Sequence, residues 1–293
     1  MSANKVNDTK EQHRVKIAFT NELKGGAIFC VGNKAQAIAC ESAGAISVIA
    51  VDPRSIKDIE KKVGVSRMID PSKIKDIMDV VAIPVFGRVR IGHEMEARIV
   101  ETIMVNGADE HEMLSSVAAG ERHIKKRNYK IPFICGASDL GEALRRIQEG
   151  ASMIRIKGNS AEDTPNLAQA VEDITTIKEQ IDKAVSISND EDALKGFAEE
   201  LQVRFDYLKQ VAQLGKLPVP IFGSGGIVQP ADAAYMIELG CDGVIISNSV
   251  FAGSANERRI HSIVKAVQNP NNYKLIAELS EDLFAPDIGS LSE

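Results

Sequence analysis

Short hydrophobic runs alternate with amphipathic stretches along most of the chain. Eight of these runs are hydrophobic at consecutive positions, which is typical of parallel strands that are buried on both faces. The runs are AIFCV (27–31), ISVIAV (46–51), VVAIPVF (80–86), TIMVNGA (102–108), IPFICG (131–136), SMIRIK (152–157), PVPIFG (218–223) and GVIIS (243–247). Eight such strands separated by helices predict an α/β fold, a (β/α)8 TIM barrel.

The stretches between the runs carry helix start and stop signals. In DPSKIKDIMDVV (70–81) hydrophobic residues recur every three or four positions, Asp70 is placed to cap a helix and Pro71 to occupy its first turn. In QPADAAYMIELG the residues Pro230 and Gly240 mark a start and an end in the same way. The longest connection contains two or three helical segments, so we expect a helical excursion after strand six.

The length of 293 residues suits one large domain. We expect a flexible N-terminal tail at 1–13, a single barrel domain at 14–285 and a C-terminal tail at 286–293. Hydrophobic residues make up 44% of the chain and charged residues 26%, which is typical of a globular protein.

The charge and the hydropathy exclude several function classes. The net charge of -6 argues against an extended nucleic-acid or anionic-membrane footprint. No hydrophobic run is long enough to cross a bilayer and the first residues lack a signal-peptide pattern, so we expect a cytoplasmic protein. The four cysteines lie far apart without CxxC spacing, which indicates reduced, buried thiols. We expect no metal site and no cofactor.

Polar residues gather where the predicted strands end, which is the working face of such a barrel. The glycines Gly225 and Gly226 follow strand seven, where barrels commonly hold a phosphate with backbone amides. A tight turn before a helix would need glycine as well, so both interpretations stay open. The other residues at strand ends are Cys30, Asp52, Arg88, Arg90, Asp109, Glu110, Cys135, Arg155 and Lys157, with Ser247 and Asn248 after strand eight.

Four long segments carry a family resemblance. LKGGAIFCV, PVFGRVRIGHEMEARIVE, PFICGASDLGEALRRIQEGASMIRIKG and GKLPVPIFGSGGIVQPADAAYMIELGCDGVIISNSVF resemble the synthase subunit of pyridoxal 5'-phosphate synthase, the PdxS/Snz family, from about residue 14 to about residue 285. The resemblance implies a barrel that makes this vitamin B6 compound from ribose 5-phosphate, glyceraldehyde 3-phosphate and ammonia. It also implies a partner glutaminase that supplies the ammonia, and hexameric rings that stack into dodecamers.

Two residues depart from the family pattern at the expected reaction centre. The lysine of a family segment similar to PVMAK-A/V-RIGH, which carries the sugar as an imine, falls on Arg88. Arginine does not deprotonate in proteins, so it forms no comparable Schiff base. The family aspartate at the end of strand one falls on Cys30, which is most simply a small buried residue. A reactive thiolate promoted by Arg88 is the second interpretation.

The expected phosphate site keeps some of the family residues and loses others. The family segment RTKGEPGTGN corresponds to RIKGNSAEDTPN, which keeps Arg155, Lys157 and Gly158 but loses the later glycines and gains Glu162 and Asp163. At strand eight the family segment VGSGIF corresponds to ISNSVF, where Ser247 and Asn248 replace glycine and serine.

A second anion site of the family is partly kept. Its lysine falls on Glu199, which reverses the charge, whereas His123, Arg145 and Arg146 remain. The family's acidic segment also remains, and it contains Asp109 among the residues expected to bind substrate.

These changes lead to three hypotheses. The first is a pseudoenzyme, not itself an enzyme, that joins a catalytic paralogue in mixed rings, or forms homo-oligomers, with a glutaminase subunit as a further partner. The second is an active synthase that uses Lys157 as its remaining family lysine. The third is a new reaction that uses Cys30 and Arg88. If Lys157 is not a nucleophile, we expect it to pair with Asp109 or Glu110.

Overall fold

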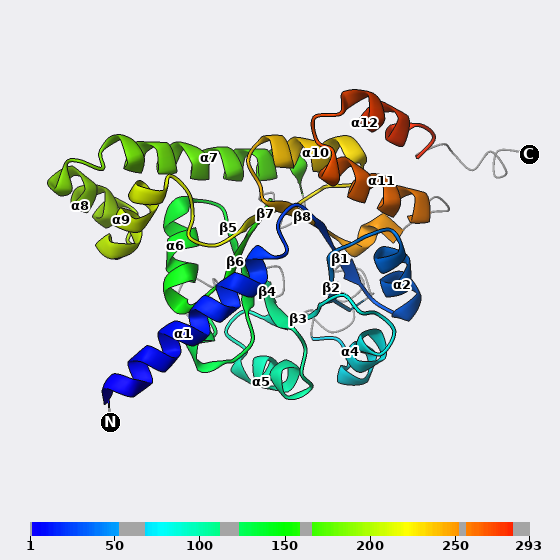
Figure 1. Cartoon of the computed structure of the whole chain (residues 1–293), viewed down its shortest axis with the longest axis horizontal. Helices are drawn as coiled ribbons and strands as arrows, with labels where there is room; N and C mark the ends of the chain where they lie inside the picture. Colours follow the sequence, from blue (N-terminus) through cyan, green and yellow to red (C-terminus); the bar gives the residue numbers. More distant parts are fainter. Residues whose placement is uncertain (1, 53–67, 112–122, 159–165, 252–255, 284–293) are drawn as a thin grey trace, which may run out of the picture.

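Eight parallel strands close into a barrel in which the order around the barrel follows the order along the chain (Figure 1). The computed structural model describes residues 2–52, 68–111, 123–158, 166–251 and 256–283. The strands are β1 (Ala27–Val31), β2 (Ser47–Ala50), β3 (Val85–Arg90), β4 (Gly107–His111), β5 (Phe133–Ala137), β6 (Met153–Ile156), β7 (Ile221–Gly223) and β8 (Gly243–Ile246). The predicted (β/α)8 fold is confirmed.

Helices surround the barrel, as Figure 1 shows. Two of them, α4 and α10, begin where the sequence signals predict. Asp70 caps α4 by accepting a hydrogen bond from the Ser72 amide at 2.8 Å, and Pro71 is its first residue. Pro230 opens α10 within a capping box. The helices around the barrel are α2 (Lys34–Ser42), α4 (Pro71–Met78), α5 (Glu94–Thr102), α6 (Leu140–Glu149), α7 (Leu167–Ser186), α10 (Pro230–Glu238) and α11 (Asn256–Gln268).

The expected excursion after strand six consists of α7 together with α8 (Glu191–Glu200) and α9 (Phe205–Leu214). A last helix, α12 (Tyr273–Ser280), packs on α10 and α11. Two short 3-10 helices complete the described part, η2 (Lys126–Asn128) before β5 and η3 (Asn248–Phe251) after β8. No helix in the described part of the chain is long and apolar enough to cross a membrane.

Two strands begin five residues later than the hydrophobic runs that predicted them. The run at 80–86 predicts β3, which spans Val85–Arg90, and the run at 102–108 predicts β4, which spans Gly107–His111. The cause is that both strands carry charged side chains on their barrel-facing positions. A search for hydrophobic runs therefore stops before the charged half of each strand and takes up connecting residues in front of it.

The barrel interior and the layer under the helices form separate hydrophobic clusters. The interior cluster contains Ile28, Phe86, Met153 and Phe222, and it is closed off from solvent. Residues at alternate positions, such as Val89, belong to the larger cluster between the sheet and the helices. This alternation aims the side chains at 30, 88, 109 and 155 into the upper part of the barrel.

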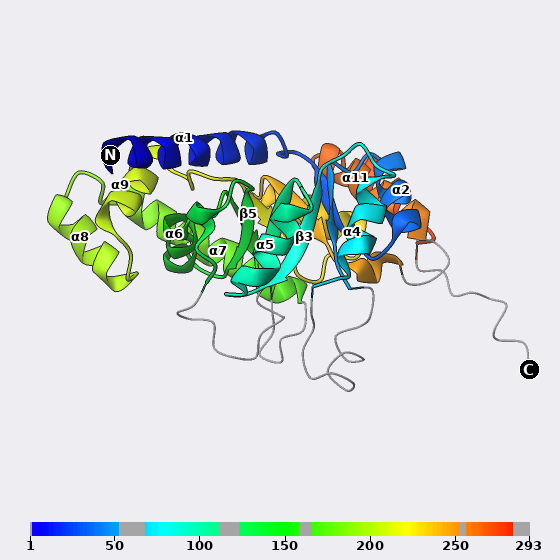
Figure 2. The ribbon, with the colours of Figure 1, turned by 90° about the horizontal axis from the view of Figure 1, so that it is seen from below.

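The N-terminal segment is helical, whereas we expected a loose tail up to residue 13. Helix α1 (Ser2–Asn21) lies across the amino ends of the strands (Figure 2). The Lys16 ammonium is buried and donates to the carbonyls of Tyr129 and Lys126, and the Thr20 hydroxyl donates to the Ser152 carbonyl at 2.6 Å. These contacts anchor the second half of a helix whose polar sequence alone gives little indication of it. The predicted C-terminal tail at 286–293 lies outside the described residues.

We expect two glycine-to-alanine variants to change stability in opposite directions. A Cβ at Gly243 would lie 2.3 Å from the buried Phe222 ring and 2.7 Å from the Gly26 carbonyl oxygen, so Gly243→Ala should lower the free energy of unfolding by about 1–3 kcal/mol. A Cβ at Gly196 in α8 meets nothing within 4 Å, so Gly196→Ala should raise it by roughly 1 kcal/mol. Denaturant unfolding at equal protein concentration measures both, and a Gly243→Ala protein as stable as the parent would contradict the packing described.

We expect the docking of α1 to weaken in acid through His13. Burial and the nearby charges of Arg127 and Lys16 lower the pKa of His13 from 6.5 to about 4. Between these two values the unfolded chain binds a proton at His13 that the folded chain does not, so stability should fall as the pH drops from about 6.5 to about 4. His13→Gln should match the parent above pH 7 and lose less of its melting temperature in that window. Identical pH profiles for the two proteins would contradict this assignment.

Candidate active site at the carboxyl end of the barrel

Asp109 lies at the centre of the upper barrel with no exposed surface. Arg88 stands beside it in the strand register, and its Nε donates to Asp109 Oδ2 at 2.8 Å. From β6, Arg155 places its Nε 3.7 Å from Asp109 Oδ1. Two guanidinium groups thus surround one buried carboxylate, and their ion pairs link β3 and β6 to β4.

Cys30 completes this cluster from β1. The Arg88 Nη2 donates to Cys30 Sγ at 3.2 Å, and the thiol is 2% exposed. Burial raises the pKa of Cys30, and the nearby Arg88 opposes that rise without reversing it. A raised pKa and a buried sulfur argue against a reactive thiolate and favour the interpretation of Cys30 as a small buried residue.

His111 faces the same cluster, and the sequence reasoning did not single it out. It ends β4 two residues after Asp109 and is largely buried. Burial and the charges of Arg88 and Arg155 hold the pKa of His111 well below its usual value. The imidazole is therefore neutral at physiological pH. The period of two along β4 is the signal that would have placed it beside Asp109.

Lys157 lies just beyond β6, but its partner differs from the one we expected. Its Nζ is 2.6 Å from Oε1 of Glu142, not paired with Asp109 or Glu110. Glu142 also accepts from the Ser138 amide at 3.0 Å. Burial alone would raise the pKa of Glu142, but the Lys157 charge and the hydrogen bonds from Ser138 lower it below its usual value. The lysine and a carboxylate thus form a partly buried pair at the barrel mouth.

Glu110 belongs to a different network on the outer side of β4. Its Oε2 lies 2.7 Å from Lys126 Nζ and 3.3 Å from His123 Nδ1. Lys126 also lies 2.8 Å from Glu149 Oε2. Burial alone would raise the pKa of Glu110, but His123 and Lys126 hold it below its usual value. Lys126 and Glu149 were not foreseen, because nothing in their local sequence marks them as partners of Glu110.

Arg145 and Arg146, expected at a second anion site, have different surroundings. Arg146 is buried and its Nη2 lies 3.0 Å from Glu149, so it belongs to the Glu110 network. Arg145 donates from Nη1 to the Leu201 carbonyl at 2.6 Å. Glu199, at the place of the family lysine, is exposed on α8. The anion-binding role of His123, Arg145 and Arg146 stays a prediction.

The loops after β6 and β7 pack backbone against backbone. Gly225 and Gly226 have φ angles of 90° and 70°, and a Cβ at Gly225 would lie 2.7 Å from the Gly158 Cα. The Gly158 amide donates to Asp173 Oδ2 at 2.9 Å and so is already engaged. No described residue accepts a hydrogen bond from the amides of Gly225 and Gly226. A phosphate-binding role for these two glycines stays a prediction. Glu162 and Asp163 lie outside the described residues.

Ser247 and Asn248 follow β8, which neighbours β7 in the barrel. The Ser247 and Ser249 hydroxyls lie 2.5 Å apart, and Asn248 begins η3. Both residues are therefore on the same end of the barrel as the two glycines. Among the described residues, no group of three His, Cys, Asp or Glu side chains is arranged to hold a metal ion.

Comparison with known proteins gives the family. The model of the SOR/SNZ family matches residues 12–224. The pyridoxal 5'-phosphate synthase subunit PdxS of Thermus thermophilus is 44% identical over 280 residues, which cover 96% of this chain and 94% of the relative. The PdxS subunit of Fusobacterium nucleatum is 46% identical over 91% of this chain and 93% of its own length, and the synthase-like subunit PDX1.2 of Arabidopsis thaliana is 42% identical over 96% and 88%.

These relatives overturn one expectation. From the changes at Arg88, at Cys30, in the loop after β6 and at Glu199 we expected that the chain is not an enzyme. Curated relatives that are 43–44% identical over nearly the whole chain are named as pyridoxal 5'-phosphate synthase subunits. These replacements do not outweigh that similarity, because Lys157 and the glycines after β7 remain at the barrel mouth. The resemblance noted from the sequence is confirmed, and the chain belongs to the SOR/SNZ family.

Proposed function

We propose that this chain is a catalytic subunit of a pyridoxal 5'-phosphate synthase and that Lys157 binds the carbonyl group of the sugar phosphate. The observation that carries this proposal is the pair of Lys157 and Glu142 at the carboxyl end of the barrel. Lys157 is the family lysine that this chain retains. A relative that matches this chain over 94% of its own length is named as a synthase subunit. Arg88 takes no part as a nucleophile, because a guanidinium stays protonated.

The proposed covalent step needs a proton acceptor for the lysine. The Lys157 amine adds to the substrate carbonyl to give a carbinolamine, which loses water to form the imine. The amine must first give up a proton, and the Glu142 carboxylate lies 2.6 Å away as an acceptor within hydrogen-bond reach. Because the ion pair lowers the pKa of Glu142 and favours the ammonium form, this transfer is the step that the substrate has to promote. The same carboxyl group can then return that proton to the departing hydroxyl, so that water leaves and the imine forms.

The surroundings of Lys157 suit a phosphate-bearing substrate. The amides of Gly225 and Gly226 are available at a tight turn before α10, and Ser247 and Asn248 follow the neighbouring strand β8 at the same end of the barrel. Arg88 and Arg155 add fixed positive charge deeper in the barrel. These groups support ribose 5-phosphate as the substrate that the family resemblance implies.

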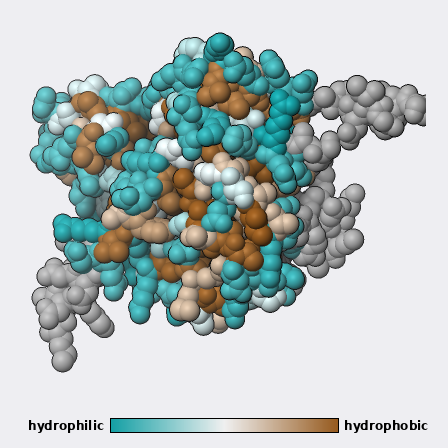
Figure 3. Space-filling model, turned by 45° about the vertical axis from the view of Figure 1, so that its right-hand side comes forward, coloured by the Kyte–Doolittle hydropathy of each residue, from teal (hydrophilic) through white to brown (hydrophobic). Residues whose placement is uncertain are grey.

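We also propose that the chain works within an assembly of subunits. The relatives are named as subunits. Large nonpolar side chains are exposed on α1, on α5 and just after α5: Val15 is 62%, Met95 61% and Met104 78% exposed. Figure 3 shows hydrophobic surface gathered in the middle of one face. Copies of this chain, a family member with lysine at the place of Arg88, and a glutaminase that supplies ammonia are the proposed partners.

Borohydride trapping tests the role of Lys157. With ribose 5-phosphate the purified protein should gain one covalent adduct, located at Lys157 by peptide mass spectrometry. Lys157→Arg preserves the positive charge but cannot form the imine, so it should abolish both the adduct and the synthesis of pyridoxal 5'-phosphate from the two sugar phosphates and ammonia. Lys183→Arg is the matched control, because Lys183 also pairs with a glutamate, at 3.0 Å, but on exposed surface. A parent protein that gives neither adduct nor product would contradict the proposal.

Native mass spectrometry tests the assembly. The protein alone should form closed multimers, with masses of six or twelve chains as the family resemblance implies. Co-expression with a tagged relative that has lysine at the place of Arg88 should give rings that contain both chains. A protein that stays monomeric at micromolar concentration would contradict the assembly, and multimers of this chain alone at every ratio would contradict mixed rings.

A further inference from the structure

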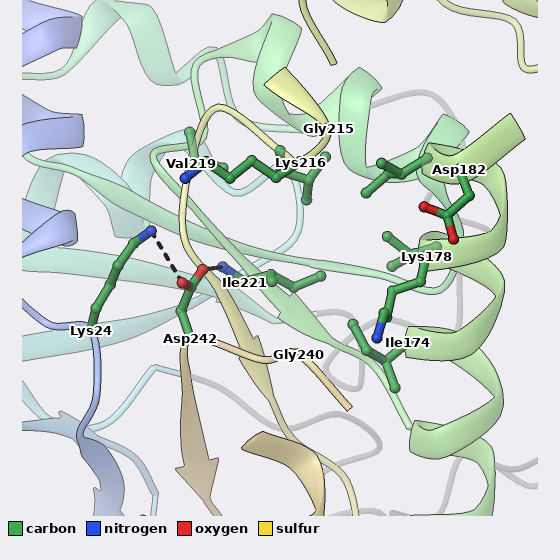
Figure 4. A pocket seen from close by; sticks show the side chains of 13 residues that line it. Lys24, Ile174, Lys178, Asp182, Gly215, Lys216, Val219, Ile221, Gly240 and Asp242 are labelled. Carbon is green, nitrogen blue, oxygen red and sulfur yellow. Dashed lines mark hydrogen bonds and ion pairs between the residues drawn. The ribbon is translucent and has the colours of Figure 1, made fainter. Parts of the chain in front are cut away.

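A pocket of about 190 Å³ lies at the end of the barrel opposite to Lys157 (Figure 4). Its walls come from α7, from the connections that precede β7 and β8, and from Lys24 between α1 and β1. Each of these connections leads into the amino end of a strand, whereas Lys157 follows the carboxyl end of β6. The pocket is therefore separate from the candidate active site.

The pocket has a hydrophobic wall that belongs to the core. Ile174, Ile177 and Ile181 line it from one face of α7, and Leu217 and Ile221 line it from the other side. All five are at most 9% exposed. A ligand that placed hydroxyl groups against this wall would leave them without hydrogen-bond partners, which costs free energy. The wall therefore favours an aliphatic group.

Some charged groups at the pocket have partners and others do not. Lys24 pairs with Asp242 at 3.1 Å, and Asp242 also accepts from the Ile221 amide at 3.0 Å, so this acid is fully engaged. Lys178, Lys216 and Asp182 make no hydrogen bond or ion pair with any described residue. Two cations and one acid are thus left, and the surplus charge is positive.

The two unpaired lysines approach the pocket from different elements. Figure 4 shows Lys216 with its amine on the same side as Lys24, and Lys178 on the other side near Ile174 and Asp182. Both side chains have long flexible stems, so their ammonium groups are able to move toward a charge within so small a cavity. A single anionic group at the rim would relieve the surplus positive charge.

We propose that this pocket binds a small aliphatic carboxylate. The carboxylate lies at the rim with Lys178 and Lys216, and the alkyl chain lies against the isoleucines of α7. The volume supports a small ligand, because pockets for drug-sized molecules hold about 300–1,000 Å³. Inorganic phosphate would use the lysines but not the wall, and a neutral alkyl compound would use the wall but not the lysines.

Binding of 6,6,6-trifluorohexanoate to the full chain, followed by fluorine NMR, tests this proposal. The probe should show saturable line broadening that unlabelled hexanoate reverses. Lys178→Gln and Lys216→Gln should each weaken binding, and the double variant should weaken it about tenfold or more, as expected for the loss of charge-assisted hydrogen bonds. Lys183→Gln is the matched control, because it lies on the same helix, is exposed and pairs with Glu200 away from the pocket. The affinity of the Lys183→Gln variant for the probe should equal that of the parent protein.

Several results would overturn the proposal. These are no broadening at millimolar probe, equal displacement by hexanamide, equal displacement by acetate or inorganic phosphate, or unchanged affinity in the double lysine variant. The competition experiments use only the parent protein, so they decide the question even if a variant folds poorly. Equal displacement by hexanamide would remove the role of the lysines, and equal displacement by acetate or phosphate would remove the role of the wall.

Discussion

A buried carboxylate needs positive charge around it, and the upper part of this barrel is arranged to meet that need for Asp109. Leaving such a group unpaired would cost about 3–5 kcal/mol. Arg88 approaches it from the neighbouring strand β3 and Arg155 from β6, and Cys30 supplies a small neutral contact for the far end of Arg88. Arginine can lie across two partners at once in a way that a lysine cannot. The residue at 88 therefore has a structural reason to be where it is, independent of any reaction.

The alternation of side chains along β4 separates two charge systems that are adjacent in sequence. Asp109 points into the barrel toward the arginines, whereas Glu110 points outward to Lys126 and His123. Neither acid is left to neutralise Lys157, which pairs with Glu142 from α6 instead. The lysine at the barrel mouth thus has a carboxylate of its own, and the charges of the two groups balance each other.

Much of the fold can be predicted from the sequence, because eight buried strands leave eight hydrophobic runs. The positions of β3 and β4 are less predictable, since their inward residues near the mouth are charged. Helix α1 is predicted poorly because its sequence is polar and its anchors, Lys16 and Thr20, bind backbone carbonyls more than a hundred residues away. Strand ends locate Cys30, Arg88, Asp109 and Lys157 at one mouth.

Partners such as Glu142 for Lys157 and Asp173 for Gly158 come from helices, and no local pattern announces them. This limit also explains why the expectation of an inactive protein was wrong. That expectation treated the replaced residues as the loss of the whole site, although an imine can form at any lysine that reaches the carbonyl and can release its proton. Whether a site works depends on such neighbours, and they are visible only once the helices are in place around the barrel.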